Sequence, residues 1–268
     1  SLGLFFIITL PSLKWDSFLI LAMLMILGWL LLDGLPSHEI LFSGGRFILI
    51  FAALIATMTL SKATASTMPS VRLTQRKLAM LTPEASSAGL QIAGHVFGGI
   101  INTGSFAVLS AALPRDSDEH RRKLAAEAAL RGMVTSAVWS PFFVAFAVGE
   151  GFVGTSYAWV AMGIGIATSI LFTLICCYVF SPEFSRNTLQ ASLACLTPIS
   201  LRVIVVLSTV LGFALIFNLT ALSAVVITMP ILVCVQFARH PGNVRRIITT
   251  THNGLSQISD DLIIISGA

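Results

Sequence analysis

The sequence predicts an all-α membrane protein, a polytopic helical bundle, and two observations support this. First, 56% of its 268 residues are hydrophobic and only 10% are charged, with a mean hydropathy of +0.91, whereas soluble domains carry roughly 25% charged residues. Second, the apolar residues form long uncharged runs at 17–32, 47–60, 157–180 and 203–237. Because about 20 apolar residues span a bilayer as a helix, we expect several transmembrane helices.

The charged residues and cysteines narrow the class further. The net charge is +4, but the basic residues form short clusters between the apolar runs. This is the distribution that membrane topology produces, so we exclude nucleic acid as a partner. Four cysteines, Cys176, Cys177, Cys195 and Cys234, lie in or beside apolar segments without the spacing of metal ligands. We interpret them as small packing residues.

The apolar runs and the basic residues together predict a topology. We expect spans near 1–12, 17–33, 46–61, 128–149, 156–180, 199–217 and 219–237. The chain opens and stops inside apolar runs, so we expect it to be a fragment cut within helices. Segment 85–113 is flanked by two basic connections, 61–84 and 114–127, which should both be cytoplasmic.

A segment whose ends lie on the same side must enter the membrane and return, so 85–113 reads as a re-entrant helical hairpin. Gly98, Gly99 and Gly104 would permit the bend. With this topology every Lys and Arg except Arg46 lies on the cytoplasmic side. The alternative is a single full crossing with an unusual charge distribution.

The helix after the hairpin should be broken. Pro141 removes a backbone donor and clashes with the preceding turn, which predicts a break near Ser136 to Pro141 in a helix over 117–149, followed by a second half-helix at 142–148. The order of spans then restarts in inverted orientation. We therefore predict a first transporter repeat at 1–180, a cytoplasmic linker at 181–198, and a truncated second repeat at 199–268.

These elements resemble the ion transporter superfamily, which includes divalent anion/sodium symporters, citrate carriers and the large membrane subunits of TRAP transporters. The resemblance lies in the hairpin sequence Gly98-Gly99-Ile100-Ile101-Asn102-Thr103-Gly104-Ser105, the basic helix after it, and Ser136-Ala137-Val138-Trp139-Ser140-Pro141. The sequence departs from the family where sodium/dicarboxylate members show Ser-Asn-Thr, and it lacks the double proline of TRAP subunits. The resemblance implies an inverted-repeat fold with broken helices.

Candidate binding residues lie at the hairpin tip and at the helix break. Amide and hydroxyl groups beside freed backbone groups can replace the hydration of an ion or an anion. We predict a solute and ion site formed by Asn102, Thr103, Gly104, Ser105, Thr135, Ser136, Ser140 and Pro141, with Na⁺ at Asn102, Thr103 and Ser136. The alternative is that these Ser and Thr hydroxyls bond within their own helices or pack at helix crossings.

Few other polar residues enter the predicted spans. His95 enters with the hairpin and could carry a coupling proton; a neutral histidine bonded to a carbonyl is the competing interpretation. No Asp or Glu lies deep in a predicted span, which favours sodium coupling. Asn218 lies in a tight link between two spans, and we interpret it as a turn residue.

The sequence therefore favours a secondary active transporter for a small anionic, carboxylate-like solute, driven by Na⁺ or H⁺ through an elevator or rocking mechanism. We expect a multi-pass protein of a bacterial inner membrane, in contact with the lipid bilayer, as a homodimer or with a partner membrane subunit, and without cofactors. A non-catalytic subunit of a transport complex and an intramembrane enzyme remain the alternatives. The enzyme lacks support because His-Glu-x-x-His and Gly-x-Ser-x-Gly motifs do not occur.

Overall fold

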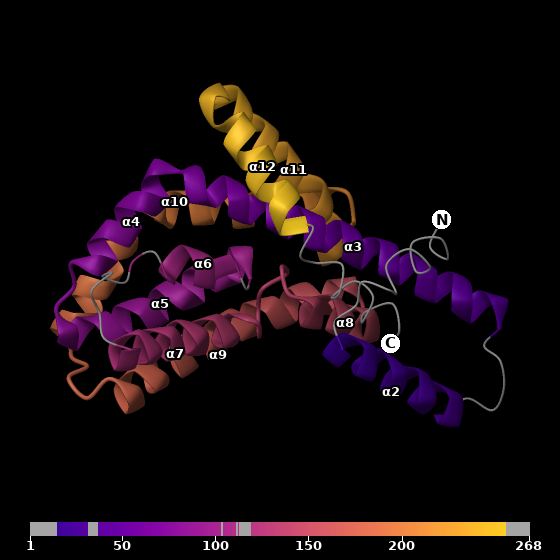
Figure 1. Ribbon diagram of the computed structural model, residues 1–268, viewed down its shortest axis with the longest axis horizontal. Helices are drawn as coiled ribbons and strands as arrows, with labels where there is room; N and C mark the ends of the chain where they lie inside the picture. Colours follow the sequence, from indigo (N-terminus) through magenta and orange to yellow (C-terminus); the bar gives the residue numbers. More distant parts are fainter. Residues whose placement is uncertain (1–14, 32–36, 103, 111, 113–118, 256–268) are drawn as a thin grey trace.

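The elements that the structure describes are all helical, as the sequence predicted. Figure 1 shows the computed structural model, which describes residues 15–31, 37–102, 104–110, 112 and 119–255. In these ranges the order is α2 (Trp15–Leu31), α3 (His38–Thr67), α4 (Pro69–Ala79), α5 (Pro83–Ile101), α6 (Gly104–Ser110), α7 (Glu119–Ser136), α8 (Val144–Val153), α9 (Thr155–Phe180), α10 (Arg186–Ile216), α11 (Ala221–Arg239), the 3₁₀ turn η2 (Pro241–Asn243) and α12 (Val244–Leu255).

Three helices, α9, α10 and α11, are long and apolar enough to cross a membrane. They correspond to the predicted spans 156–180, 199–217 and 219–237, although α10 ends at Ile216 and α11 begins at Ala221. The predicted spans 17–33 and 46–61 correspond to α2 and α3, and span 1–12 lies outside the described residues. The described part of the chain is therefore compatible with an all-α membrane protein.

Two connections between the predicted spans, 61–84 and 181–198, are largely helical. Segment 61–84 contains the end of α3 and the whole of α4, with a kink at Met68 before Pro69. Helix α10 begins at Arg186, inside the predicted linker 181–198, because Ser185 forms a capping box with Thr188. The capping box stabilises the start of α10, whereas α4 has no side-chain cap and is stabilised by packing against α10.

Helix α5 lies between α10 and α7 and packs against both (Figure 1). It is nearly all buried and contributes Ala88, Ala93 and Phe97 to a core shared with α4, α6, α7, α9 and α10. A second core joins α3, α10 and α11 around Phe142. Because Phe142 lies in the interrupted segment after α7, this second core fixes the position of that segment.

The contact between α5 and α7 depends on glycines. A Cβ atom on Gly132 would overlap the Gln91 carbonyl, and one on Gly94 would overlap the Ala129 carbonyl. Backbones that approach this closely tolerate no side chain, as at the tightest helix crossings in membranes. The two helices therefore form one closely packed unit.

The chain turns back after α5. Asn102, which has φ 50°, ends the helix, and α6 then packs against α5. The chain returns to the start of α5, because Ala112 lines the same pocket as Ser86 and Leu90. We name the connection between Ile101 and Ser105 the 102–104 turn; Thr103 lies outside the described residues.

The structure corrects the expected role of two glycines in this hairpin. Helix α5 stays helical through Gly98 and Gly99, and the bend occurs at Asn102. The glycines instead permit close contact with the end of α7 and the segment after it: a Cβ on Gly98 would lie 2.8 Å from Ser136 Oγ, and one on Gly99 would lie 2.5 Å from the Trp139 ring. Glycine is therefore needed at these two positions for close packing and not for backbone flexibility.

The expected break in the next helix is present. Helix α7 ends at Ser136 and α8 begins at Val144, so residues 137–143 interrupt the helix around the buried Pro141. We name this segment the 137–143 break. The second half-helix is Val144–Val153 rather than the predicted 142–148.

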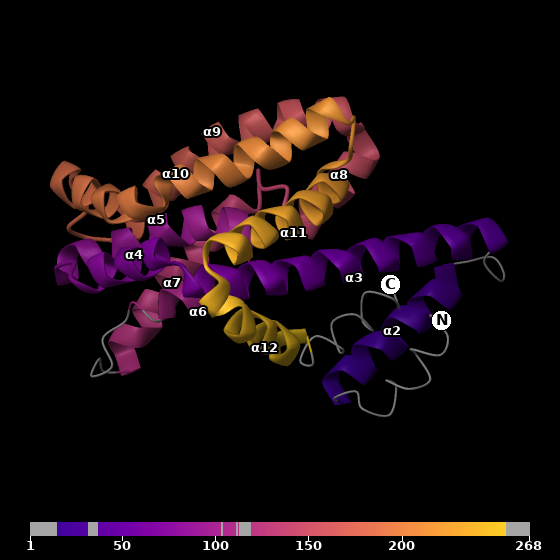
Figure 2. The same ribbon diagram turned by 90° about the horizontal axis from the view of Figure 1, so that it is seen from above.

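The last two long helices are joined by a tight turn, where Figure 2 shows α10 and α11 meeting. Asn218 has φ 50° there, as expected of a turn residue. After α11 the chain forms α12, which packs on α3 through the buried Ile247 and through Gly254 beside Thr59. Asp260, Asp261 and the final apolar run lie outside the described residues.

Candidate functional site

The 102–104 turn and the 137–143 break meet each other. The Asn102 amide, through Nδ2, donates a hydrogen bond to the Phe142 carbonyl at 3.3 Å. The Ser140 hydroxyl donates to the Gly99 carbonyl at 2.8 Å, and its oxygen accepts from the Phe142 N–H at 3.1 Å. We name these four residues, Gly99, Asn102, Ser140 and Phe142, the junction. At the junction two interrupted helices hold each other through polar groups.

The local sequence explains why the junction forms. The N–H groups of Trp139 and Ser140 both donate to the Ser136 carbonyl, which closes the last turn of α7. Pro141 then offers no N–H, so the regular helix stops. The backbone groups that the stop leaves unpaired are satisfied by the Ser140 and Asn102 side chains. The expected juxtaposition of hairpin tip and helix break is present for these two side chains.

Ser136 lies beside the junction but bonds within its own helix. Its hydroxyl donates to the Met133 carbonyl at 2.6 Å, while its side chain packs against Gly98. The hydroxyl oxygen can still act as an acceptor or an ion ligand. With Thr103 outside the described residues, sodium at Asn102, Thr103 and Ser136 stays a prediction.

A buried hydroxyl from the start of α6 and a lysine side chain from α3 lie beside the 102–104 turn. Ser105 is 1% exposed, and within the described ranges its Oγ has no hydrogen-bond partner, although its N–H donates to the Asn102 carbonyl at 3.0 Å. The Lys62 side chain from α3 covers Gly104, since a Cβ there would lie 3.2 Å from Lys62 Cβ, Cγ and Cδ. The sequence predicted that Lys62 lies in a cytoplasmic connection. Its local sequence pattern does not indicate that it contacts a helix from a distant part of the chain.

His95 and Thr135 form a separate cluster one helical turn from the junction. His95 Nδ1 lies 3.0 Å from Thr135 Oγ1 and 3.4 Å from Thr173 Oγ1, and the two threonine hydroxyls are 3.0 Å apart. Thr135 also donates to the Gly132 carbonyl. The sequence grouped Thr135 with the junction, whereas the structure directs its hydroxyl toward His95 and α9.

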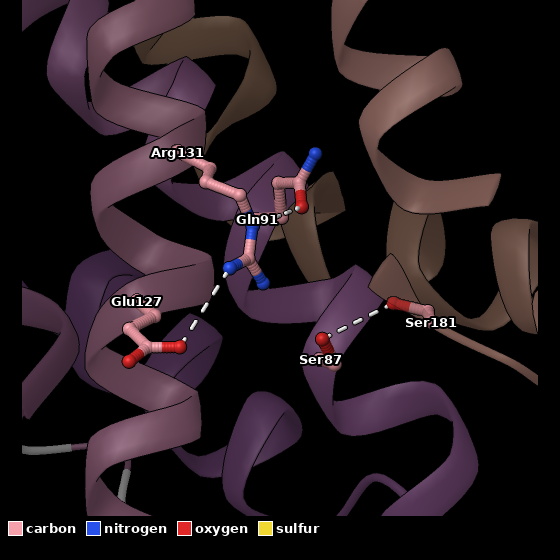
Figure 3. Close-up of polar contacts among 5 residues, drawn as sticks. All are labelled: Ser87, Gln91, Glu127, Arg131 and Ser181. Carbon is pink, nitrogen blue, oxygen red and sulfur yellow. Dashed lines mark hydrogen bonds and ion pairs between the residues drawn. The ribbon is translucent and has the colours of Figure 1, made fainter. Parts of the chain in front are cut away.

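A third polar group continues along the same helices (Figure 3). Gln91 is fully buried; its Nε2 donates to the Thr173 carbonyl at 3.1 Å, and its Oε1 accepts from Arg131 Nε at 3.3 Å. Arg131 also lies 4.0 Å from Glu127 and stacks over the Phe180 ring at 4.5 Å. Buried polar groups with partners of this kind fix the register of α5, α7 and α9.

Sequence reasoning missed a buried carboxylate. Glu150 in α8 is 5% exposed, and its two oxygens accept from the Ala221 N–H at 3.2 and 2.9 Å. It thereby caps the start of α11, where a carboxylate is favoured by the helix dipole. Glu150 lies one residue past the predicted span 128–149 between two glycines. A buried carboxylate therefore accompanies the broken helix, just outside the predicted span.

Across the described ranges, no three His, Cys, Asp or Glu side chains gather as a metal site would require. No protein-family profile, curated protein or solved structure matches the chain. The assignment of the candidate site is therefore supported by its geometry alone.

Proposed function

We propose that this protein is a secondary active transporter that moves a small anionic, carboxylate-like solute coupled to Na⁺ or H⁺. The observation that carries the proposal is the junction, where Asn102 from a helix turn bonds to Phe142 in a helix break and Ser140 bonds back to Gly99. Secondary transporters bind their substrates where discontinuous helices meet, since freed backbone groups there can replace the hydration of an ion.

The solute site would lie at the 102–104 turn. The Ser105 hydroxyl, which has no hydrogen-bond partner among the described residues, and the Asn102 amide would supply hydrogen-bonding groups. The stem of the exposed Lys62 covers Gly104, and its ammonium group would supply a positive charge to the site. A cation beside hydroxyl and amide donors favours an anionic solute over a neutral or cationic one.

Alternating access would move the hairpin together with α7. The α5 and α7 backbones are locked by Gly94 and Gly132, so the junction and the solute site would travel as one unit. Either ion could drive this movement. Na⁺ would use oxygens of Asn102, Thr103 and Ser136, whereas H⁺ would use His95 or Glu150, both of which are buried.

The test is uptake by the complete protein in proteoliposomes, with a panel of carboxylates and inorganic anions and with a sodium or a proton gradient. We expect gradient-dependent uptake that falls at least tenfold in Asn102→Ala and in Ser140→Ala. The matched controls are Asn187→Ala and Ser200→Ala, which change exposed side chains of α10 and should retain uptake. Uptake unchanged in both junction variants would contradict the site.

Lys62 provides a second, separable test. Lys62→Gln should raise the KM for the transported anion by about tenfold, because one charge-assisted hydrogen bond is lost, while Lys62→Arg should restore most of the affinity. Arg245→Gln on the exposed face of α12 is the charge-matched control. An unchanged KM in Lys62→Gln would remove Lys62 from the site and leave the junction in place.

The location and assembly follow from the resemblance to the ion transporter superfamily. We propose a multi-pass protein of the bacterial inner membrane, working as a homodimer or with a partner membrane subunit. If the complete protein alone moves no solute, and uptake appears only with a co-purified membrane subunit, the protein would be one component of a transport complex.

A further inference from the structure

An apolar pocket lies between five helices, and Ile100 and Ile101 of α5 separate it from the polar groups of the junction. Residues of α3, α4, α5, α10 and α11 enclose about 90 Å³, and its walls include Met68, Phe97, Val203 and Met229. The two hydroxyl residues in its α3 wall add no free donors. Ser61 Oγ donates to the Thr57 carbonyl at 2.7 Å and Thr64 Oγ1 to the Leu60 carbonyl at 2.8 Å. The pocket therefore offers hydrocarbon surface.

One charged side chain, Arg202, belongs to the wall of this pocket. Arg202 lies in α10, one of the helices apolar enough to cross a membrane, and it is half-buried. No residue in the described ranges forms an ion pair or hydrogen bond with it. A guanidinium beside hydrocarbon needs an anion or water to compensate the cost of its desolvation.

The surroundings of Arg202 point to lipid. Its neighbours Leu201, Ile204 and Val205 are 71%, 59% and 47% exposed, so this face of α10 presents large apolar side chains outward. In a bilayer such a face contacts acyl chains, and a soluble anion would have to leave water to reach it.

The charges near the pocket have one sign. Helix α4, which supplies Val71 to the pocket wall, carries the exposed Arg72 and Arg76. Its Lys77 Nζ donates to the Ala194 carbonyl and the Thr197 hydroxyl, each at 3.3 Å, which ties α4 to the segment of α10 before Arg202. Neither α4 nor α10 contains an acidic residue. Basic side chains next to lipid-facing surface attract acidic headgroups.

We propose that this pocket binds a short stretch of one acyl chain of an anionic membrane phospholipid whose phosphate pairs with Arg202. The pocket supplies the hydrocarbon surface, Arg202 the counter-charge, and the arginines of α4 a positive surface for the rest of the headgroup. The lipid would fill the space between α4 and α10, two helices that pack on α5. The site does not depend on the transported solute.

The experiment measures lipid affinity of the complete purified protein by native mass spectrometry and by thermal unfolding in detergent. The probes are phosphatidylglycerol, phosphatidylcholine and inorganic phosphate. We expect phosphatidylglycerol to raise the unfolding temperature and phosphatidylcholine and phosphate not to. Arg202→Gln should weaken phosphatidylglycerol binding about tenfold, whereas Arg202→Lys should retain most of it.

The matched control is Arg186→Gln, at the exposed start of the same helix, which should bind as the unaltered protein does. Val203→Phe, which fills the pocket without changing charge, should also reduce binding and so tests the acyl-chain position. Equal binding of both lipids, or unchanged phosphatidylglycerol binding in Arg202→Gln, would overturn the proposal. A phosphate effect lost in Arg202→Gln would identify a soluble-anion site instead and would equally overturn it.

Discussion

Helices α5 and α9 are both rich in apolar residues, yet they are buried to different extents. Helix α5 is buried on nearly every face, and small residues such as Gly94 and Gly98 let α7 approach it. Helix α9 buries a stripe of small residues that includes Gly165, Ser169 and Thr173, and its other faces expose large apolar side chains. Helix α9 is apolar enough to cross a membrane and α5 is not, and the two helices also differ in where their small residues lie. A helix surrounded by protein has small residues all round, and one that faces lipid has them on a single stripe.

The largest expected effect on stability comes from adding a side chain where the backbones of α5 and α7 are in contact. Gly132→Val would place side-chain atoms on the Gln91 carbonyl. We expect a loss of stability of about 3 kcal/mol, the upper range for overpacking, measured by thermal unfolding in detergent. Gly163→Val is the control, since a Cβ at Gly163 on α9 meets open space, and it should unfold like the unaltered protein. Equal stability of the two variants would break the comparison.

A second effect concerns the buried amide. Gln91→Leu keeps the volume but leaves the Thr173 carbonyl and Arg131 Nε without their partner. We expect a loss of about 2 kcal/mol, because buried polar groups left unpaired cost more than the hydrogen bond itself. The control Gln190→Leu changes an exposed glutamine of α10. If Gln91→Leu is as stable as its control, α5 is not held by this network.

The smallest effect sharpens the description of α9. Thr173→Val removes the hydroxyl that faces His95 and Thr135, with little change of shape. We expect a loss of about 1 kcal/mol. Thr168→Val on the same helix removes a hydroxyl that bonds only to the Ile164 carbonyl four residues earlier, so it should be neutral. A larger loss in Thr168→Val would show that the stripe has been assigned to the wrong face.

Much of the fold could be predicted because lipid-facing helices leave long uncharged runs in the sequence, as in α9 and α11. The position of the break could also be predicted, since Pro141 prevents a regular helix. The turn at 102–104 was anticipated near its glycines, although Asn102 rather than Gly98 or Gly99 adopts the bend. These features depend on local chemistry, which a sequence contains.

The remaining features depend on distant contacts. Lys62 reaches the hairpin turn and Glu150 reaches Ala221 only because helices far apart in the sequence pack together. Thr135 and Ser136 are neighbours in sequence, yet one hydroxyl faces His95 and the other its own helix. No local pattern decides which way each hydroxyl points, so part of the predicted site is divided between two clusters.

The most direct test of the central claim is equilibrium binding, which requires neither a gradient nor a partner. The purified complete protein would be titrated with the panel of carboxylates and inorganic anions, and binding followed by thermal stabilisation. We predict that at least one anion stabilises the unaltered protein and the Asn187→Ala control, and that this stabilisation is lost in Asn102→Ala. An anion that stabilises all three proteins equally would contradict a binding site at the junction.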